Sequence, residues 1–140
     1  MKILAAVDGS PYTKRMLAYI AAHDEWLGTH HEYTLIHAVP AVPSRAAVVL
    51  EKEVLKAYYD DCAERVFKPI RTFFVRRGLN ATYVTKVGQA AEIITDAAKK
   101  GRYDLLMLGS HGHGTLTNLV MGSVATKVLA NCDTPALLIR

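Results

Sequence analysis

The sequence predicts an α/β fold in which a parallel β-sheet carries helices on both faces. Short apolar runs alternate with longer amphipathic segments in the order βαβαβαβαβ, a pattern typical of parallel sheets. The apolar runs are nearly continuous, as expected for strands that are buried on both faces. The chain has 140 residues, of which 51% are hydrophobic, so residues 1–140 are expected to form one domain with a core of its own.

Five apolar runs are the predicted strands. They cover residues 3–7, 33–39, 81–87, 105–108 and 136–139. The first four stop at glycine, proline or the Asp8–Gly9 pair, and Pro135 opens the last one. No linker or second domain interrupts the pattern, which therefore predicts a single sheet.

Amphipathic segments between these runs are the predicted helices. Ser10 and Pro11 mark the first helix start, because serine is a favoured N-cap and proline suits the first helical position. Proline removes a backbone donor, so Pro69 is expected to kink or divide the long second helix. The predicted helices cover residues 11–27, residues 46–77, a segment ending at residue 100, and residues 123–130.

Composition argues against several classes of protein. The net charge of +4 is mild, and the basic residues are not interleaved with aromatic residues, so no nucleic-acid partner is expected. Two cysteines, Cys62 and Cys132, do not make a disulfide framework. No apolar run approaches the roughly 20 residues of a membrane helix, and Asp8 follows too soon for a signal peptide. A cytoplasmic protein without a membrane partner is expected.

Two loops carry the candidate functional residues. Ligands of open α/β sheets bind beyond the C-terminal strand ends, where the winding reverses. Asp8 follows the first predicted strand, and a glycine-rich loop, residues 109–123, follows the fourth. These loops would face each other if the second half of the chain winds outward from the first strand. Asp8 could then satisfy donors of its own turn or accept a hydrogen bond from a ligand.

The glycine-rich loop has the features of a phosphate site. Its glycines let a ligand approach the backbone closely, and Gly122–Ser123 opens a helix whose N-terminal N–H groups suit a phosphate. The Ser123 hydroxyl could bind a phosphate oxygen or cap the helix. The spacing matches neither a Walker A loop nor the dinucleotide fingerprint.

The spacing Gly109-x-x-Gly112, nine residues, then Gly122-Ser123 resembles the nucleotide motif of the universal stress protein family. The resemblance covers the whole chain, including residues 7–11, 35–39 and 133–140. It implies a Rossmann-like sheet of strand order 3-2-1-4-5, a homodimer, and the branch of the family that binds ATP. An apolar last strand at a sheet edge also favours pairing with a second copy.

The resemblance also implies the ligand and the residues that bind it. The ligand is ATP, with ADP or AMP as alternatives, and magnesium is held through the phosphates rather than by protein ligands. The implied binding residues are Asp8 and Ala38 at the adenine, Gly109 and Gly112 beside the ribose and phosphates, Gly122, Ser123 and Val124 at the helix start, and Leu108, Ser110 and His111 along the same turn.

Two loop positions depart from the family pattern. His113 and Asn118 stand where relatives often carry a basic residue. Without a fixed cation near the phosphates, we expect a weaker or more pH-dependent affinity for ATP.

The expected function is that of a nucleotide-dependent sensor or regulator in a stress response, with an unidentified protein partner. ATP would order residues 113–121 and change the surface that the partner meets. The alternatives are a slow ATPase or autophosphorylating enzyme, and a nucleotide-free dimeric interaction module. The possible phosphate acceptors of the enzyme alternative are Ser110, Thr115, Thr117 and Ser123.

Two further classes are disfavoured by missing residues. A two-component receiver domain needs an aspartate after the third strand, where Val87 leads to Gly88. A zinc site needs three or four ligands in register, and no cysteine or carboxylate accompanies the histidine pairs at ligand spacing.

Overall fold

The computed structural model describes residues 1–114, 118 and 120–140. Its strands and long helices alternate as the sequence predicts, with two short helices in addition. The elements are β1 (Lys2–Ala6), α1 (Pro11–Ala22), α2 (Asp24–Leu27), β2 (Glu32–Val39), α3 (Ser44–Val49), α4 (Lys52–Arg76), β3 (Asn80–Val87), α5 (Ala90–Gly101), β4 (Leu105–Gly109), α6 (Ser123–Asn131) and β5 (Ala136–Ile139).

The five strands form one parallel sheet in the order β3-β2-β1-β4-β5, which confirms the predicted order. Strand β1 lies at the centre, so Ile3 has Tyr33 of β2 on one side and Leu105 of β4 on the other. The first half of the chain winds from β1 to β3, and the second half winds from β4 to β5 on the opposite side. The winding therefore reverses between β1 and β4, where a ligand crevice is expected.

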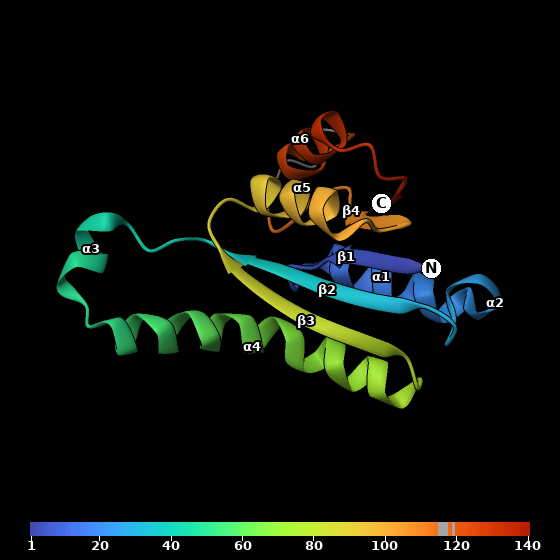
Figure 1. The fold of residues 1–140 in the computed structure, drawn as a ribbon, viewed down its shortest axis with the longest axis horizontal. Coiled ribbons are helices and arrows are strands. Elements are labelled where there is room, and N and C mark those ends of the chain that lie inside the picture. Colours follow the sequence, from blue (N-terminus) through green and yellow to red (C-terminus); the bar gives the residue numbers. More distant parts are fainter. Residues whose placement is uncertain (115–117, 119) are drawn as a thin grey trace.

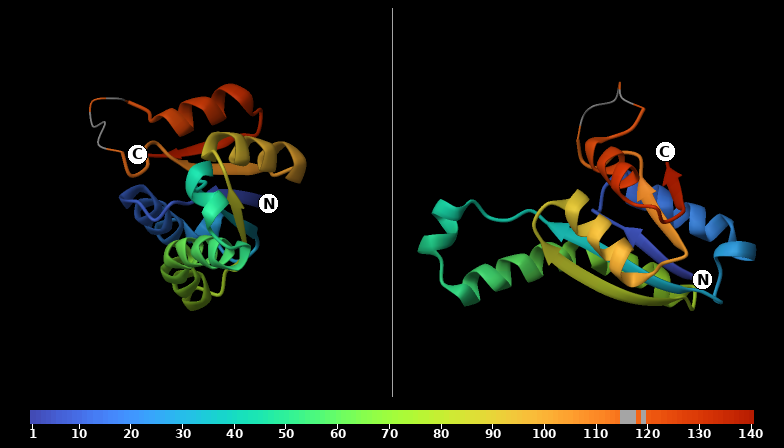
Figure 2. Two further views of the ribbon diagram at one scale, coloured as in Figure 1. Left: turned by 90° about the vertical axis from the view of Figure 1, so that its left-hand side faces the viewer. Right: turned by 45° about the horizontal axis from the view of Figure 1, so that its top comes forward.

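Helices cover both faces of the sheet (Figures 1 and 2). Helices α1 and α4 pack on one face, over a core that contains Met16 and Phe74. Helices α5 and α6 pack on the other face, around Ile94 and Val128. Within the described parts of the chain, no helix is both long and apolar enough to cross a bilayer.

Two predicted helices are divided at places that the sequence did not indicate. The first ends at Ala22, and His23 separates it from α2. The second is divided at Leu50, whose backbone is extended (φ −95°, ψ 139°), and not at Pro69. Pro69 lies inside α4 and does not divide it.

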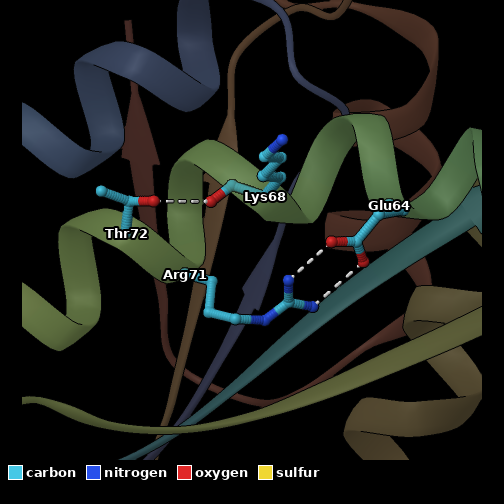
Figure 3. Close-up of polar contacts among 4 residues, drawn as sticks. All are labelled: Glu64, Lys68, Arg71 and Thr72. Atoms are coloured by element: carbon cyan, nitrogen blue, oxygen red, sulfur yellow. Dashed lines mark hydrogen bonds and ion pairs between the residues drawn. The ribbon is translucent and has the colours of Figure 1, made fainter.

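Side-chain hydrogen bonds link the turns of α4 on either side of Pro69 (Figure 3). The Arg71 guanidinium donates to both carboxylate oxygens of Glu64, at 2.7 and 3.2 Å, and so spans two turns. The Thr72 hydroxyl donates to the Lys68 carbonyl at 3.1 Å. The hydrogen bond from Arg71 lowers the pKa of the Glu64 carboxyl. Because the pair is open to solvent, it contributes little to stability.

Helix α3 and the first turns of α4 stand away from the sheet (Figure 1). No residue of α3 is buried, and the side chains of Val48 and Val49 are 85% and 81% exposed. One anchor of this arm is the backbone N–H of Val42, which donates to the Tyr59 hydroxyl at 2.9 Å. The arm therefore contributes almost nothing to either core.

Candidate functional site

A cavity of about 290 Å³ opens at the C-terminal ends of the central strands, at the reversal of strand order. Its described lining comes from the β1–α1 turn, the end of β2, the start of α5, the glycine-rich loop after β4, and the first turn of α6. Segments that lie more than a hundred residues apart in the sequence thus meet at one place. This is the crevice that the strand order predicts.

The two carboxylate oxygens of Asp8 have different surroundings. Its Oδ1 atom accepts hydrogen bonds from the backbone N–H of Ser10 (2.9 Å) and from the hydroxyl of Thr13 (3.1 Å). Its Oδ2 atom accepts no hydrogen bond from any described residue, and it faces the backbone of Gly112. One oxygen therefore holds the turn at the start of α1, and the other is available to a ligand in the cavity.

Neighbouring atoms lie so close to the backbone of the loop glycines that a side chain would not fit there without a shift. A Cβ atom on Gly112 would lie 2.6 Å from Asp8 Oδ2, and one on Gly109 would lie 2.7 Å from the Cβ of Tyr12. A Cβ atom on Gly122 would make a tight contact, 3.1 Å, with the Ser110 carbonyl oxygen. Any side chain at the first two positions would displace its neighbours. The space that glycine leaves open fits a ligand that lies against the backbone.

Two short backbone hydrogen bonds fix the ends of the loop. The N–H of Ser110 donates to the Ile139 carbonyl, and the N–H of Gly122 donates to the Ser110 carbonyl, both at 2.6 Å. The Ser110 side chain is buried, and its Oγ lies 3.0 Å from His111 Nδ1. Ser110 is the one predicted binding residue that does not line the cavity; its place is structural.

Helix α6 begins at the cavity with unsatisfied donors. Gly122 is its N-cap, so of the two roles that the sequence left open for Ser123, capping the helix is excluded. The Thr126 N–H donates to the Gly122 carbonyl, and the N–H groups of the three preceding residues, 123–125, have no acceptor within the helix. The Ser123 hydroxyl makes no hydrogen bond with any described residue and lines the cavity. An anion placed here would be bound by backbone N–H groups at the positive end of the helix dipole.

Histidines and an aromatic ring close one side of the cavity. His113 Nε2 lies 2.6 Å from the Asp8 carbonyl oxygen and so joins the glycine-rich loop to the β1–α1 turn. The centre of the His111 ring lies 5.4 Å from that of the Tyr12 ring, and the Arg15 guanidinium lies over the Tyr12 ring, 5.0 Å from its centre. The two histidines are thus part of the wall of the cavity.

Metal ligands do not gather in the described parts of the chain. Among residues 1–114, 118 and 120–140, no three His, Cys, Asp or Glu side chains are placed to hold a metal ion together. Thr115 and Thr117 lie outside the described residues, as does part of the predicted ordering segment, residues 113–121.

A model of the universal stress protein family matches residues 1–140, which is the whole chain. The chain belongs to the universal stress protein family. A relative from Thermus aquaticus, a universal stress protein encoded in the 3′ region of the QAH/OAS sulfhydrylase gene, is 31% identical over 139 residues. That match covers 99% of this chain and 97% of the relative.

Solved structures of other universal stress proteins share the fold. UspA from Lactobacillus plantarum matches with a TM-score of 0.79 and 20% identity, over 100% of this chain and 97% of its own. A family member from Arabidopsis thaliana, solved with AMP bound, matches with a TM-score of 0.70 and 14% identity, over 99% and 90%. Two further neighbours with this fold were solved as complexes, one with cAMP and one, from Archaeoglobus fulgidus, with dAMP.

The sequence motif of this universal stress protein identified only part of the lining. Asp8, Ala38 and the glycines were predicted, and Leu108, His111, Ser123 and Val124 with them; all line the cavity. Two more lining residues, His113 and Gly114, belong to the glycine-rich loop itself. The other lining residues were missed because neighbouring elements supply them and no local motif marks them. They are Ala6, Val7, Tyr12, Thr13, Ile36, His37, Ala90, Ile94 and Ala125.

Proposed function

We propose that this universal stress protein binds an adenine nucleotide in the cavity between the β1–α1 turn and the glycine-rich loop. The observation that carries the proposal is that one cavity contains both Asp8 Oδ2, which accepts no hydrogen bond from a described residue, and the unsatisfied N–H groups at the start of α6. The carboxylate oxygen suits a donor on a base or ribose, and the N–H groups suit a phosphate. Neighbours of the same fold that hold AMP, cAMP and dAMP support an adenine nucleotide.

The cavity offers separate surroundings to the base and to the phosphate. Ile36, Ala38 and Ile94 supply an apolar surface for the adenine, with the Ala38 backbone at its edge. Gly112 and Ser123 also line the cavity, and neutral donors there would hold the phosphate. The resemblance to the ATP-binding branch implies ATP, with Mg²⁺ held by its phosphates, and ADP and AMP would use the same base contacts.

The proposed role is that of a nucleotide-dependent regulator for a protein partner. A nucleotide that contacts Gly112 and Ser123 would hold both ends of the intervening loop and so change the surface presented there. The loop from Gly109 to Gly122 contains no Lys or Arg, so trypsin has no site in it, whereas chymotrypsin has the leucines and Met121. We expect nucleotide to slow chymotryptic cleavage in this loop. Equal rates with and without nucleotide would contradict the switch.

Thermal unfolding of nucleotide-stripped protein tests binding directly. A ligand at one hundred times its dissociation constant stabilises the folded state by about 2.7 kcal/mol, which for this size corresponds to roughly 5–10 °C in Tm. Gly122→Val should abolish the shift, because its side chain would meet the Ser110 carbonyl. No shift with ATP, ADP or AMP would instead support the nucleotide-free interaction module.

Turnover separates a regulator from the enzyme alternative. We expect ATP that is incubated with the protein and Mg²⁺ for hours to remain intact. Chromatographic detection of ADP or of phosphoprotein above the level in a Gly122→Val control would support a slow ATPase or an autophosphorylating enzyme. Ser123 is the described acceptor candidate that lines the cavity, because the Ser110 side chain is buried outside it.

The open edge of β5 supports a homodimer as part of the proposal. Strand β5 pairs with β4 on one side only, and no described strand covers its other side. An uncovered strand edge is an aggregation hazard that a second copy would remove. The dimer would leave the cavity accessible, because β5 forms the end of the sheet and the cavity lies at β1 and β4.

A further inference from the structure

The phosphate end of the proposed site has no fixed positive charge. The glycine-rich loop from Gly109 to Ser123 contains neither lysine nor arginine. The described lining of the cavity also contains no lysine or arginine, and its one acidic side chain is that of Asp8. Among the described residues, the donors at the helix start are the neutral N–H groups of residues 123–125 and the hydroxyl of Ser123, and the backbone of residues 112–114 also lines the cavity. Neutral donors of this kind suit one phosphate at the helix start, and they supply no cation for further phosphates.

The histidines of the loop are already committed to contacts within the protein. His113 Nε2 lies 2.6 Å from the Asp8 carbonyl oxygen, and His111 Nδ1 lies 3.0 Å from the Ser110 hydroxyl. Each of these contacts occupies one ring nitrogen, so a second or third phosphate could meet either ring only through its other nitrogen. The volume of about 290 Å³ lies at the lower limit of the roughly 300–1,000 Å³ of small-molecule sites, which also favours a compact ligand.

Lys127 is the cation closest in sequence to this helix start, and it does not line the cavity. It lines a neighbouring groove, which continues toward Pro40 and Gln89 and shares four residues with the cavity: Ala38, Ala90, Ser123 and Val124. That groove contains neither His111 nor any glycine of the loop. A variant of Lys127 therefore tests whether this cation reaches the phosphates.

We infer that the site, if it binds an adenine nucleotide as proposed above, selects adenosine with a single phosphate, of the AMP or cyclic AMP class, over ATP. The first phosphate receives the backbone donors of α6. The further phosphates of ATP add negative charge that no lysine or arginine of the site compensates, and they add it beside the carboxylate of Asp8. The protein would then respond to the level of adenosine monophosphates.

Calorimetric titration of the nucleotide-stripped full chain with AMP, cAMP and ATP tests this at constant ionic strength, with and without Mg²⁺. We expect AMP or cAMP to bind at least about tenfold more tightly than ATP, which corresponds to about 1.4 kcal/mol. ATP binding as tightly as AMP, or more tightly, would overturn the selectivity and leave the proposed function standing. Absence of binding by all three nucleotides would overturn the proposed function, and the inference with it.

Charge variants test the cause of the selectivity. His113→Arg should tighten ATP binding by roughly five- to tenfold and change AMP binding by less, since the added cation serves the outer phosphates. Val75→Arg adds the same charge on α4, where the side chain is 73% exposed, and should leave the ratio of the two affinities unchanged. Lys127→Gln should also preserve that ratio. A selective loss of ATP affinity in Lys127→Gln would show that Lys127 already binds the polyphosphate and would refute the inference.

Discussion

The Nε2 atom of His113 lies 2.6 Å from the backbone carbonyl oxygen of Asp8, a residue 105 positions earlier in the chain. The carbonyl can only accept, so the imidazole donates to it through Nε2. This contact joins the glycine-rich loop to the β1–α1 turn beside the cavity. His113 therefore forms part of the wall of the site.

Gly112→Ala is expected to weaken nucleotide binding by at least about tenfold. Its Cβ would lie 2.6 Å from Asp8 Oδ2, so the carboxylate or the loop must shift. Gly114→Ala is the matched control, because a Cβ there meets nothing within 4 Å. Calorimetric titration with AMP measures both variants. Equal losses of affinity in the two would contradict the role assigned to the close approach of Gly112.

Asp8→Asn and Asp8→Ala separate the two functions of this carboxylate. Asparagine keeps an acceptor for Ser10 and Thr13, so the free energy of unfolding should change by less than about 1 kcal/mol. Alanine removes both hydrogen bonds and should cost about 1–3 kcal/mol in urea unfolding. Nucleotide affinity should fall by about tenfold or more in both variants. If the asparagine variant bound as the native protein does, Asp8 would act only by shaping its turn.

Tyr33 gives the protein a specific sensitivity to alkaline pH. Burial raises the pKa of Tyr33 to about 12, and its hydroxyl donates to the Leu27 carbonyl at 2.6 Å. The unfolded chain ionises this tyrosine near pH 10.0, before the folded protein does, so ionisation stabilises the unfolded state first. The contribution of Tyr33 to stability is therefore complete below pH 10 and is lost as the pH rises toward 12.

Tyr33→Phe should remove that alkaline loss, which denaturant unfolding between pH 8 and about 11.5 would measure. At neutral pH the variant should be less stable by about 1 kcal/mol, because the Leu27 carbonyl loses its donor. Tyr103→Phe is the control, since the Tyr103 hydroxyl makes no hydrogen bond with any described residue. An unchanged alkaline slope in Tyr33→Phe would rule out Tyr33 as its source.

Ala136→Pro should weaken the proposed dimer without unfolding the protein. Pro135 and Ile139 accept hydrogen bonds from β4, so the intervening Ala136 directs its backbone groups to the open edge of β5. Proline at this position removes an outward N–H and leaves the β4 ladder intact. Sedimentation equilibrium should show a dissociation constant higher by about an order of magnitude than in Ala136→Val, which keeps the donor. A monomeric native protein at micromolar concentration would refute the dimer.

The sheet and its ligand crevice could be predicted because strands leave a strong local signal. The run at Ala136–Ile139 has the bounds that its apolar residues indicate, and the other strands differ by one or two residues. The division at Leu50 could not be predicted, because apolar residues continue at helical spacing on both sides of it. There the chain stands away from the sheet, and its exposed side chains find no core whose packing would stabilise a continuous helix.

Individual roles in the site were harder to predict than its position. Ser110 follows a strand in a nucleotide motif, yet hydrogen bonds to Ile139 and Gly122 place it in the structure of the loop. Tyr12 and Ile94 line the cavity because neighbouring elements bring them there, and their spacing along the chain is that of ordinary helix residues. Such contributions depend on tertiary packing and are invisible to a linear motif.

Neither apolar core includes a described residue of the loop between Gly109 and Ser123. The described part of the loop that would bind the phosphate is thus distinct from the cores that keep the domain folded, although core residues such as Ile36 and Ile94 line the base end of the cavity. In a cell, where a loss of 1–2 kcal/mol can change protein abundance several-fold, a substitution such as Gly112→Ala is expected to leave the protein level nearly intact. A strain that carries this allele would still contain the protein but would lack its nucleotide-bound form. Its phenotype would therefore show which effects of the protein depend on the bound nucleotide.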